Sequence, residues 1–101
     1  MINRFAVYQL DSDDARMRDM YFMSTQEIEA ISDEYELVAM IDANDLEQAF
    51  TVGNIGAEAR INRLAPMRSV SVGDILEDLV TGKTYVVAKF GFDEIKMKES
   101  V

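Results

Sequence analysis

Apolar and polar positions along the chain follow two different periods, and the change of period separates strands from helices. Residues 4–10, RFAVYQL, are rich in aromatic and β-branched side chains facing both ways, which predicts a strand with both faces partly covered. Residues 35–41, YELVAMI, form a nearly continuous apolar run that is typical of a strand in the middle of a sheet. Residues 85–90, YVVAKF, predict a further strand by their β-propensity.

A capping signal predicts where the first helix begins. In the sequence STQE at residues 24–27, the Ser24 hydroxyl would accept a hydrogen bond from the Glu27 amide, while the Glu27 carboxylate accepts one from the Ser24 amide. We therefore expect a short helix from Thr25 to about Ser32, with its isoleucines facing inward.

A second capping signal, at Asn44 and Asp45, predicts another helix. Gly53 is the expected end of that helix, because glycine commonly follows the last helical residue. A third short helix is expected over residues 56–64, where Pro66 would end it.

Two segments give no single prediction from periodicity. Residues 11–23 open with turn-forming residues and then become apolar without a clean period, so we expect a loop with about one helical turn. Residues 75–80 fit a helical face as well as a strand that turns back at Gly82.

Composition excludes several kinds of chemistry. A chain of 101 residues has room for one domain, and 49% apolar residues can fill its core. The absence of cysteine and histidine excludes disulfides, thiolate zinc sites and catalytic triads built on histidine, and it fits a reducing cytoplasm. No apolar run approaches the roughly 18 residues of a membrane helix, and the amino-terminal run is too short for a signal peptide. We expect a cytoplasmic protein without membrane contact, cofactor, metal or catalytic residue.

Charge is distributed unevenly along the chain. The formal net charge is −9. Residues 1–50 hold twelve acidic and three basic residues, residues 51–101 hold seven of each, and no basic residue lies between Arg18 and Arg60. A field of one sign repels nucleic acid and favours basic protein surfaces. Direct binding of nucleic acid is therefore not expected.

The acidic residues in this base-free interval are the candidate partner-binding set. Irregularly spaced carboxylates can imitate the phosphates of a nucleic acid and occupy a basic groove on another protein. The alternative is a solvated acidic face that provides only solubility. The candidates are Glu27, Glu29, Asp33, Glu34, Glu36, Asp42, Asp45 and Glu47.

Methionines interleaved with aromatic residues form a second candidate surface. Met17, Met20 and Met23 surround Tyr21 and Phe22, and methionine adapts well to irregular interfaces. The same spacing is also typical of core filling. A non-enzymatic adaptor or regulator that binds a host cytoskeletal or element-encoded protein through this surface is the alternative function.

The stretch RSVSVGDI at residues 68–75 resembles a ligand loop but favours a turn. A phosphate cradle would need more glycines and a lysine, and a metal site would need more ligands than Asp74. We expect Gly73 to adopt a positive φ and Asp74 to accept a hydrogen bond from a backbone amide. Arg60, Arg63 and Arg68 could bind an anion, but pairing with the acidic half of the chain is the expected arrangement.

Motifs at both ends of the chain carry a family resemblance. RFAVYQL, RMRDMYFMS, YELV, RSVSVGDI and YVVAKFGFDEI together resemble the YodL-like domain of Gram-positive bacteria and their mobile elements. Ser69, Val70, Ser71, Val72, Asp74 and Ile75 match one family segment, and Gly91, Phe92 and Glu94 match the end of the following hairpin. Lys89 departs from the aspartate that the family carries before that end.

The resemblance implies both a fold and a role. The fold is α+β, with residues 1–95 in one domain, a mixed or antiparallel sheet of about four strands, two or three short helices and a carboxyl-terminal β-hairpin. Residues 75–80 are then a strand, and residues 96–101 a charged, frayed tail. Together with the uneven charge and the absence of catalytic residues, the resemblance indicates a non-enzymatic inhibitor, encoded by a phage or plasmid, that binds a basic host protein as a monomer or homodimer. The most specific form is an anti-CRISPR protein acting on a Cas9-type nuclease or its guide complex.

Overall fold

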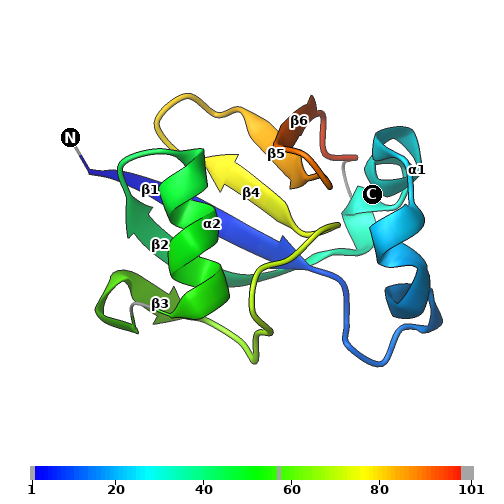
Figure 1. The fold of residues 1–101 in the computed structure, drawn as a ribbon, viewed down its shortest axis with the longest axis horizontal. Coiled ribbons are helices and arrows are strands. Elements are labelled where there is room, and N and C mark those ends of the chain that lie inside the picture. The colour runs from blue at the N-terminus through cyan, green and yellow to red at the C-terminus, as the bar shows by residue number, and fades with distance from the viewer. Residues whose placement is uncertain (1, 57, 99–101) are drawn as a thin grey trace.

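The computed structural model describes residues 2–56 and 58–98 as an α+β fold around one antiparallel sheet (Figure 1). Six strands lie in the order β3-β2-β1-β4-β5-β6, and every neighbouring pair is antiparallel. The strands are β1 (Asn3–Gln9), β2 (Glu36–Ala43), β3 (Ile61–Arg63), β4 (Ile75–Asp78), β5 (Thr84–Val87) and β6 (Phe92–Ile95). The helices are α1 (Thr25–Ala30), α2 (Leu46–Ile55) and the 3₁₀ segments η1 (Ala15–Phe22), η2 (Ser32–Glu34) and η3 (Glu58–Arg60).

Strand β1 lies inside the sheet and is buried on both faces. It pairs with β2 from Asn3 opposite Ala43 to Gln9 opposite Glu36, with a register shift between Val7 and Tyr8. Its other edge pairs with β4. Phe5 and Val7 belong to one buried cluster, whereas Leu10, just after β1, and partly buried Tyr8 contact a second cluster, so the prediction that both faces are covered is confirmed.

Helix α2 covers one face of the sheet (Figure 1). Ala49 and Val52 of the helix pack with Phe5, Ile41 and Leu76 of three strands. Partly buried Phe50 extends this cluster to β6, where its ring meets that of Phe92 edge to face at 6.2 Å. This cluster joins strands from both halves of the sheet.

The segment from η1 to η2 covers part of the opposite face. Met20 and Ile28 pack there with Tyr35 and with Ile75 and Val86 of the sheet. Met17, Met23, Ile31 and Met97 are partly buried around them. Residues 11–23, expected to be a loop with one turn, thus contain a 3₁₀ helix of eight residues that is held by its core contacts.

Helix α2 corrects the prediction for Gly53. The helix continues past Gly53 and ends at Gly56, whose φ of 80° is the left-handed conformation that glycine tolerates. Gly53 lies buried within α2 because Val70 approaches it closely. Of the two expected capping residues, Asp45 is the N-cap and accepts from the Gln48 amide at 2.8 Å.

Residues 56–64 correct a second prediction. In place of a third α-helix, residues 58–60 form the single turn η3 and residues 61–63 form β3. Ile61 lies opposite Ile41 of β2. Pairing with the free edge of β2 therefore determines the conformation of these residues, although their local pattern has a helical period. The expected four strands therefore become six, since the structure also contains β3 and β6, and the strand predicted over residues 85–90 is β5, which ends at Val87.

Strand β4 resolves the ambiguity at residues 75–80. Ile75 to Asp78 is a strand, and residues 79–82 form the turn back to β5. The carboxyl-terminal end is bonded to the helical layer at Lys96, whose amide donates to the Glu29 carboxylate at 2.7 Å, and at Lys98, whose amide donates to the Ser32 hydroxyl at 2.6 Å. Residues 99–101 lie outside the described residues. No helix in the described ranges is long and apolar enough to cross a membrane.

The predicted capping box is confirmed. The Glu27 amide donates to the Ser24 hydroxyl at 3.1 Å, and the Ser24 amide donates to the Glu27 carboxylate at 3.0 Å. Helix α1 has only six residues, so its first turn depends strongly on this cap.

Ser24→Ala is expected to lower the free energy of unfolding by about 1 kcal/mol, because the start of α1 loses the hydroxyl acceptor of the Glu27 amide. The fall should appear as a lower midpoint in urea unfolding. Ser12→Ala, at an exposed position in the connection before η1, is the control and should leave the midpoint unchanged. Equal midpoints for the two variants would contradict a role of the cap in stability.

Candidate binding surface

The eight candidate carboxylates lie at two ends of the molecule. Glu27 and Glu29 belong to α1, Asp33 and Glu34 to η2, and Glu36 begins β2. Asp42 is near the other end of β2, and Asp45 and Glu47 begin α2 there. Asp42 lies six positions after Glu36 along the strand, which corresponds to about 20 Å. The structure therefore brings five of the eight to one end and leaves three at the other.

Three of these carboxylates bind the backbone of their own chain. Glu27 and Asp45 cap α1 and α2, and Glu29 accepts from the Lys96 amide. These bonds explain the lowered pKa of Glu27, since the amide of Ser24 stabilises its charged form. The capping signals in the sequence predicted the roles of Glu27 and Asp45, whereas no sequence signal indicated the bond of Glu29 to the Lys96 amide.

Two other carboxylates form ion pairs on the surface. Asp42 accepts from Nε of Arg4, directly opposite on β1, at 3.1 Å. Glu34 binds both terminal nitrogens of Arg16, at 2.7 and 3.1 Å, and this hydrogen bonding lowers its pKa. Such exposed pairs contribute little to stability, but they fix where the charges lie.

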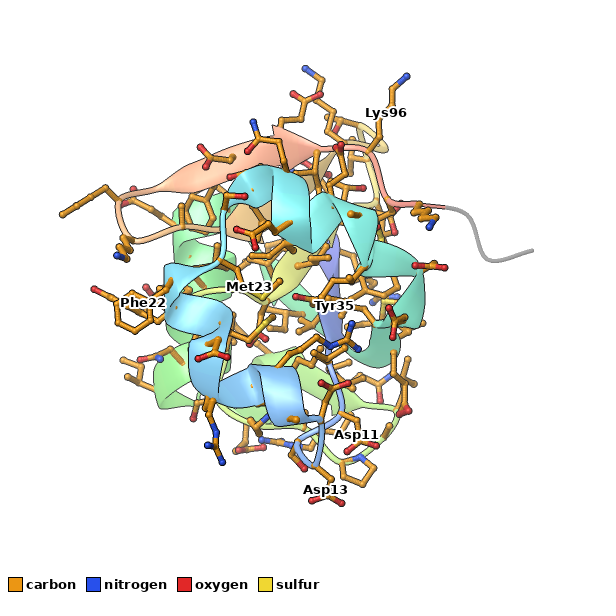
Figure 2. All side chains as sticks on the ribbon, turned by 90° about the vertical axis from the view of Figure 1, so that its right-hand side faces the viewer. Asp11, Asp13, Phe22, Met23, Tyr35 and Lys96 are labelled. Atoms are coloured by element: carbon orange, nitrogen blue, oxygen red, sulfur yellow. The ribbon has the colours of Figure 1, made fainter. Side chains whose placement is uncertain are left out.

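Arg16 brings further carboxylates to the same end of the molecule. It also binds Asp14 at 2.7 Å, which lowers the pKa of Asp14 to about 2. Asp11 and Asp13 lie beside Asp14 in the connection from β1, and Figure 2 shows them at its tip. We call the set Asp11, Asp13, Asp14, Glu34 and Glu36 the acidic end.

Sequence reasoning missed three members of the acidic end. The sequence pattern of residues 11–14 is interpreted only as a turn. Turn residues are often also charged surface residues, so this interpretation leaves Asp11, Asp13 and Asp14 out of the candidate surface. Asp11 and Glu36 line one groove of about 490 Å³ that Arg68 also borders. Only the fold places the β1–η1 connection beside the start of β2.

A buried polar network lies beneath this groove, around Asp74. The expected turn is confirmed: Gly73 has a φ of 96°, and Oδ2 of Asp74 accepts from the Ser71 amide at 3.0 Å. Oδ2 also accepts from Nε2 of Gln9 at 3.1 Å, and Arg68 Nη1 lies 3.8 Å from Oδ1. Asp74 is 2% exposed. Burial raises its pKa to about 6, against the lowering effect of these partners.

Gln9 and Tyr35 complete the network. Gln9 is bonded to the backbone of Arg68 in both directions, through Nε2 to its carbonyl and through Oε1 from its amide, each at 3.0 Å. The Tyr35 hydroxyl donates to the Gly73 carbonyl at 2.6 Å, and its burial raises the pKa of the phenol. The network therefore holds the connection before β4 against β1.

Two of the three arginines are paired locally. Arg63 pairs with Glu58, and Nη2 of Arg68 donates to the Leu10 carbonyl at 2.6 Å beside Asp74. The predicted partners are the acidic residues of the first half of the chain, but Glu58 and Asp74 both belong to the second half. These two guanidinium groups therefore serve the fold and are not assembled into an anion site.

The methionine-aromatic segment divides into core and surface. Met20 is 4% exposed, and Met17 and Met23 pack around it, as core filling predicts. Tyr21 and Phe22 are exposed, and Phe22 points away from the molecule in Figure 2. An adaptor function would therefore depend on the aromatic residues of this segment.

Comparisons with known proteins leave the family open. No protein-family model, curated protein or solved structure matches the chain. The resemblance to the YodL-like domain stays a prediction. Within residues 2–56 and 58–98, no group of three or more acidic side chains has the arrangement of a metal site.

Proposed function

We propose that this protein is a non-enzymatic binding protein whose acidic end attaches to a basic surface on a host protein and blocks it. The single observation that carries the proposal is the gathering of carboxylates from two distant segments at one end of the fold. Asp11, Asp13 and Asp14 come from the β1–η1 connection, and Glu34 and Glu36 from η2 and the start of β2.

The charges of the acidic end suit attachment to a basic surface. Asp11, Asp13 and Glu36 are exposed: Asp11 and Asp13 lie in the β1–η1 connection, and Glu36 is the first residue of β2. Arg16 holds Asp14 and Glu34 in fixed positions. Carboxylates arranged in advance lose less side-chain entropy on binding, and the net charge of −9 would speed the encounter with a basic protein.

The most specific form of the proposal is inhibition of a Cas9-type nuclease in a bacterial cytoplasm. Such a nuclease binds nucleic acid in a positively charged channel. The acidic end would occupy that channel in place of phosphates, and the protein would originate from a phage or plasmid, as the resemblance implies. Counterion release at each carboxylate contact would make the inhibition weaker as salt is raised.

Charge reversal at the acidic end tests this proposal. Asp13→Lys combined with Glu36→Lys should weaken inhibition of DNA cleavage by a Cas9-type nuclease–guide complex by roughly tenfold to a hundredfold. The dependence of inhibition on salt should also become shallower, because two ionic contacts are lost. Asp13 and Glu36 are better positions than Glu34 or Asp42, whose carboxylates are held in ion pairs.

The matched control carries the same change of charge elsewhere. Glu47→Lys combined with Glu58→Lys alters exposed positions on α2 and η3, away from the acidic end. It should retain most of the inhibition, and circular dichroism should show both double variants folded. Equal loss in the two variants would indicate that only net charge matters, and full inhibition by the acidic-end variant would rule out mimicry of nucleic acid by this surface.

A further inference from the structure

A second surface feature, a groove beside the end of η1, lies outside the acidic end. It has a volume of about 320 Å³. Ile28 of α1, Val72 of the connection before β4 and Val86 of β5 line it, and Phe22 and Phe90 border it. We call this feature the aromatic groove. It is therefore an apolar depression bordered by two large aromatic side chains.

The aromatic side chains of this groove are unusually exposed. Phe22 is 76% exposed and Phe90 is 95% exposed. Single exposed apolar residues are ordinary, but two phenylalanines bordering one apolar groove are typical of an interaction site. The backbone at Phe90 is positioned by a tight turn, in which Gly91 has a φ of 82° and the Ala88 amide donates to the Gly91 carbonyl at 3.0 Å.

One wall of the groove is held in place by local contacts. The rings of Tyr21 and Phe22 meet edge to face, with centroids 5.3 Å apart. The ammonium group of Lys89 lies 4.6 Å from the centroid of Tyr21 and 5.0 Å from that of Phe22. The two rings are thus fixed by a cation and by each other, which reduces the entropy that Phe22 would lose on binding a partner.

Charge decides which occupant suits the groove. A second copy of this chain, an anionic lipid surface and a nucleic acid would each bring negative charge toward a protein of net charge −9. Among the residues that line the groove, Asp93, which is exposed and bonded to Thr25 at 2.7 Å, is acidic and Lys89 is basic, so these two charges offset each other. The preference for a partner therefore comes from the whole protein, whose net charge of −9 favours a segment with basic residues around an apolar side chain.

We propose that the aromatic groove receives one large apolar side chain from a basic segment of a partner protein. The inference rests on the proposed function, because it gives the same basic partner a second point of attachment. The acidic end would attract the partner and set the salt dependence, whereas the groove would supply the desolvated anchor that slows dissociation.

The 3₁₀ helix η1 connects the two sites on one face of the molecule. Asp14 caps its first turn, and Phe22 is its last residue. Eight residues of 3₁₀ helix span about 16 Å. Figure 2 shows Phe22, Asp11 and Asp13 on the side of the molecule that carries η1. A single extended segment of a partner could therefore contact both sites.

Peptide titration with NMR detection tests the groove without knowledge of the partner. The probe is a short lysine-rich peptide with one central phenylalanine, and its control carries serine in place of the phenylalanine. With the phenylalanine peptide, amide shifts should appear at residues 22–25 and 88–93 as well as at the acidic end. With the serine peptide, the groove shifts should vanish while the acidic-end shifts remain.

Variants of the protein separate the groove from the acidic end. Phe22→Ser should weaken binding of the phenylalanine peptide by about tenfold or more, as for other aromatic anchors. Ile55→Ser, at an exposed apolar position on α2 with 77% exposure, is the matched control and should bind as the parent does. The acidic-end variant should lose affinity for both peptides and retain the preference for phenylalanine.

The possible results distinguish a failure of the groove proposal from a failure of the proposed function. Shifts confined to the acidic end with both peptides, or no effect of Phe22→Ser, would overturn the groove and leave the proposed function standing. A preference for phenylalanine together with no effect of the acidic-end variant would support the groove and contradict the acidic end. Stronger groove shifts with a glutamate-rich phenylalanine peptide would overturn the basic partner, because Lys89 would then select the occupant.

Discussion

Gly53→Ala is expected to destabilise the protein by about 2–4 kcal/mol, although glycine to alanine in a helix interior ordinarily stabilises by about 1 kcal/mol. A β-carbon at Gly53 would overlap the Cγ2 methyl group of Val70 and lie 3.0 Å from Cδ1 of Ile41. Both methyl groups belong to the buried core beneath α2. The loss should appear as a lower urea midpoint and a lower melting temperature.

Val70 cannot retreat from the added methyl group without breaking hydrogen bonds. Its amide donates to the Gly53 carbonyl at 3.0 Å, and its carbonyl accepts from Nδ2 of Asn54 at 2.9 Å. These bonds join the connection before β4 to α2. The strain is therefore expected to remain in the core.

The double variant Gly53→Ala with Val70→Ala separates overlap from helix propensity. Val70→Ala alone should cost about 2 kcal/mol through a cavity, but the methyl group added by Gly53→Ala should partly fill that cavity. The double variant should therefore lose less free energy of unfolding than the two single variants lose in total. A neutral or stabilising Gly53→Ala would contradict the close approach.

The same glycine explains one limit of prediction from sequence. A glycine late in a helical pattern can end the helix, or it can lie within the helix where another segment packs closely against it. The local sequence does not distinguish the two. Gly53 admits Val70, while Gly56, three residues later, takes the left-handed conformation and ends α2. The neighbour that decides is separated from Gly53 by more than a dozen residues.

Local signals succeeded where the responsible atoms are close in sequence. The capping box at Ser24 and the turn at Gly73 depend on bonds within three residues, and both are confirmed. Residues 61–63 depend on β2, and their helical period gave the wrong element. Residues 61–63 pair with the edge of β2, and the sequence around Ile61 does not show that this segment forms the pair.

The candidate surface shows the same contrast between what the local sequence indicates and what distant segments determine. The excess of acidic charge could be predicted from composition, but the grouping of the charges could not. Arg16 joins Asp14 to Glu34 across η1 and α1, whereas Asp42, closer to Glu34 in sequence, lies at the opposite end of β2. Spacing along the chain is therefore a poor guide to which carboxylates a partner would meet together.

Asp74→Ala is expected to destabilise the protein by about 3 kcal/mol at neutral pH. The substitution leaves the buried Nε2 of Gln9 and the Ser71 amide without their acceptor, and it leaves the Arg68 guanidinium without its nearby carboxylate. Urea unfolding should show the loss. Asp74→Asn should be much less destabilising, because one side-chain oxygen can still accept from both donors.

The same pair of variants predicts a pH dependence of stability. Burial raises the Asp74 pKa from its ordinary value of 3.8 to about 6, so the folded protein binds the proton more tightly than the unfolded chain. Stability contributed by this group is therefore complete below about pH 4 and falls by about 3 kcal/mol as the pH rises to about 6. Asp14 and Glu34, whose pKa values are lowered by Arg16, act in the opposite direction at lower pH.

Subtracting the Asp74→Asn profile from that of the parent isolates the contribution of Asp74. Both proteins share every other carboxylate, so the difference should lie between about pH 4 and 6 and favour the parent on the acidic side. Urea midpoints measured across this range test it. Parallel profiles would mean that the Asp74 carboxyl group titrates alike in the folded and unfolded protein, which its burial among Gln9, Ser71 and Arg68 argues against.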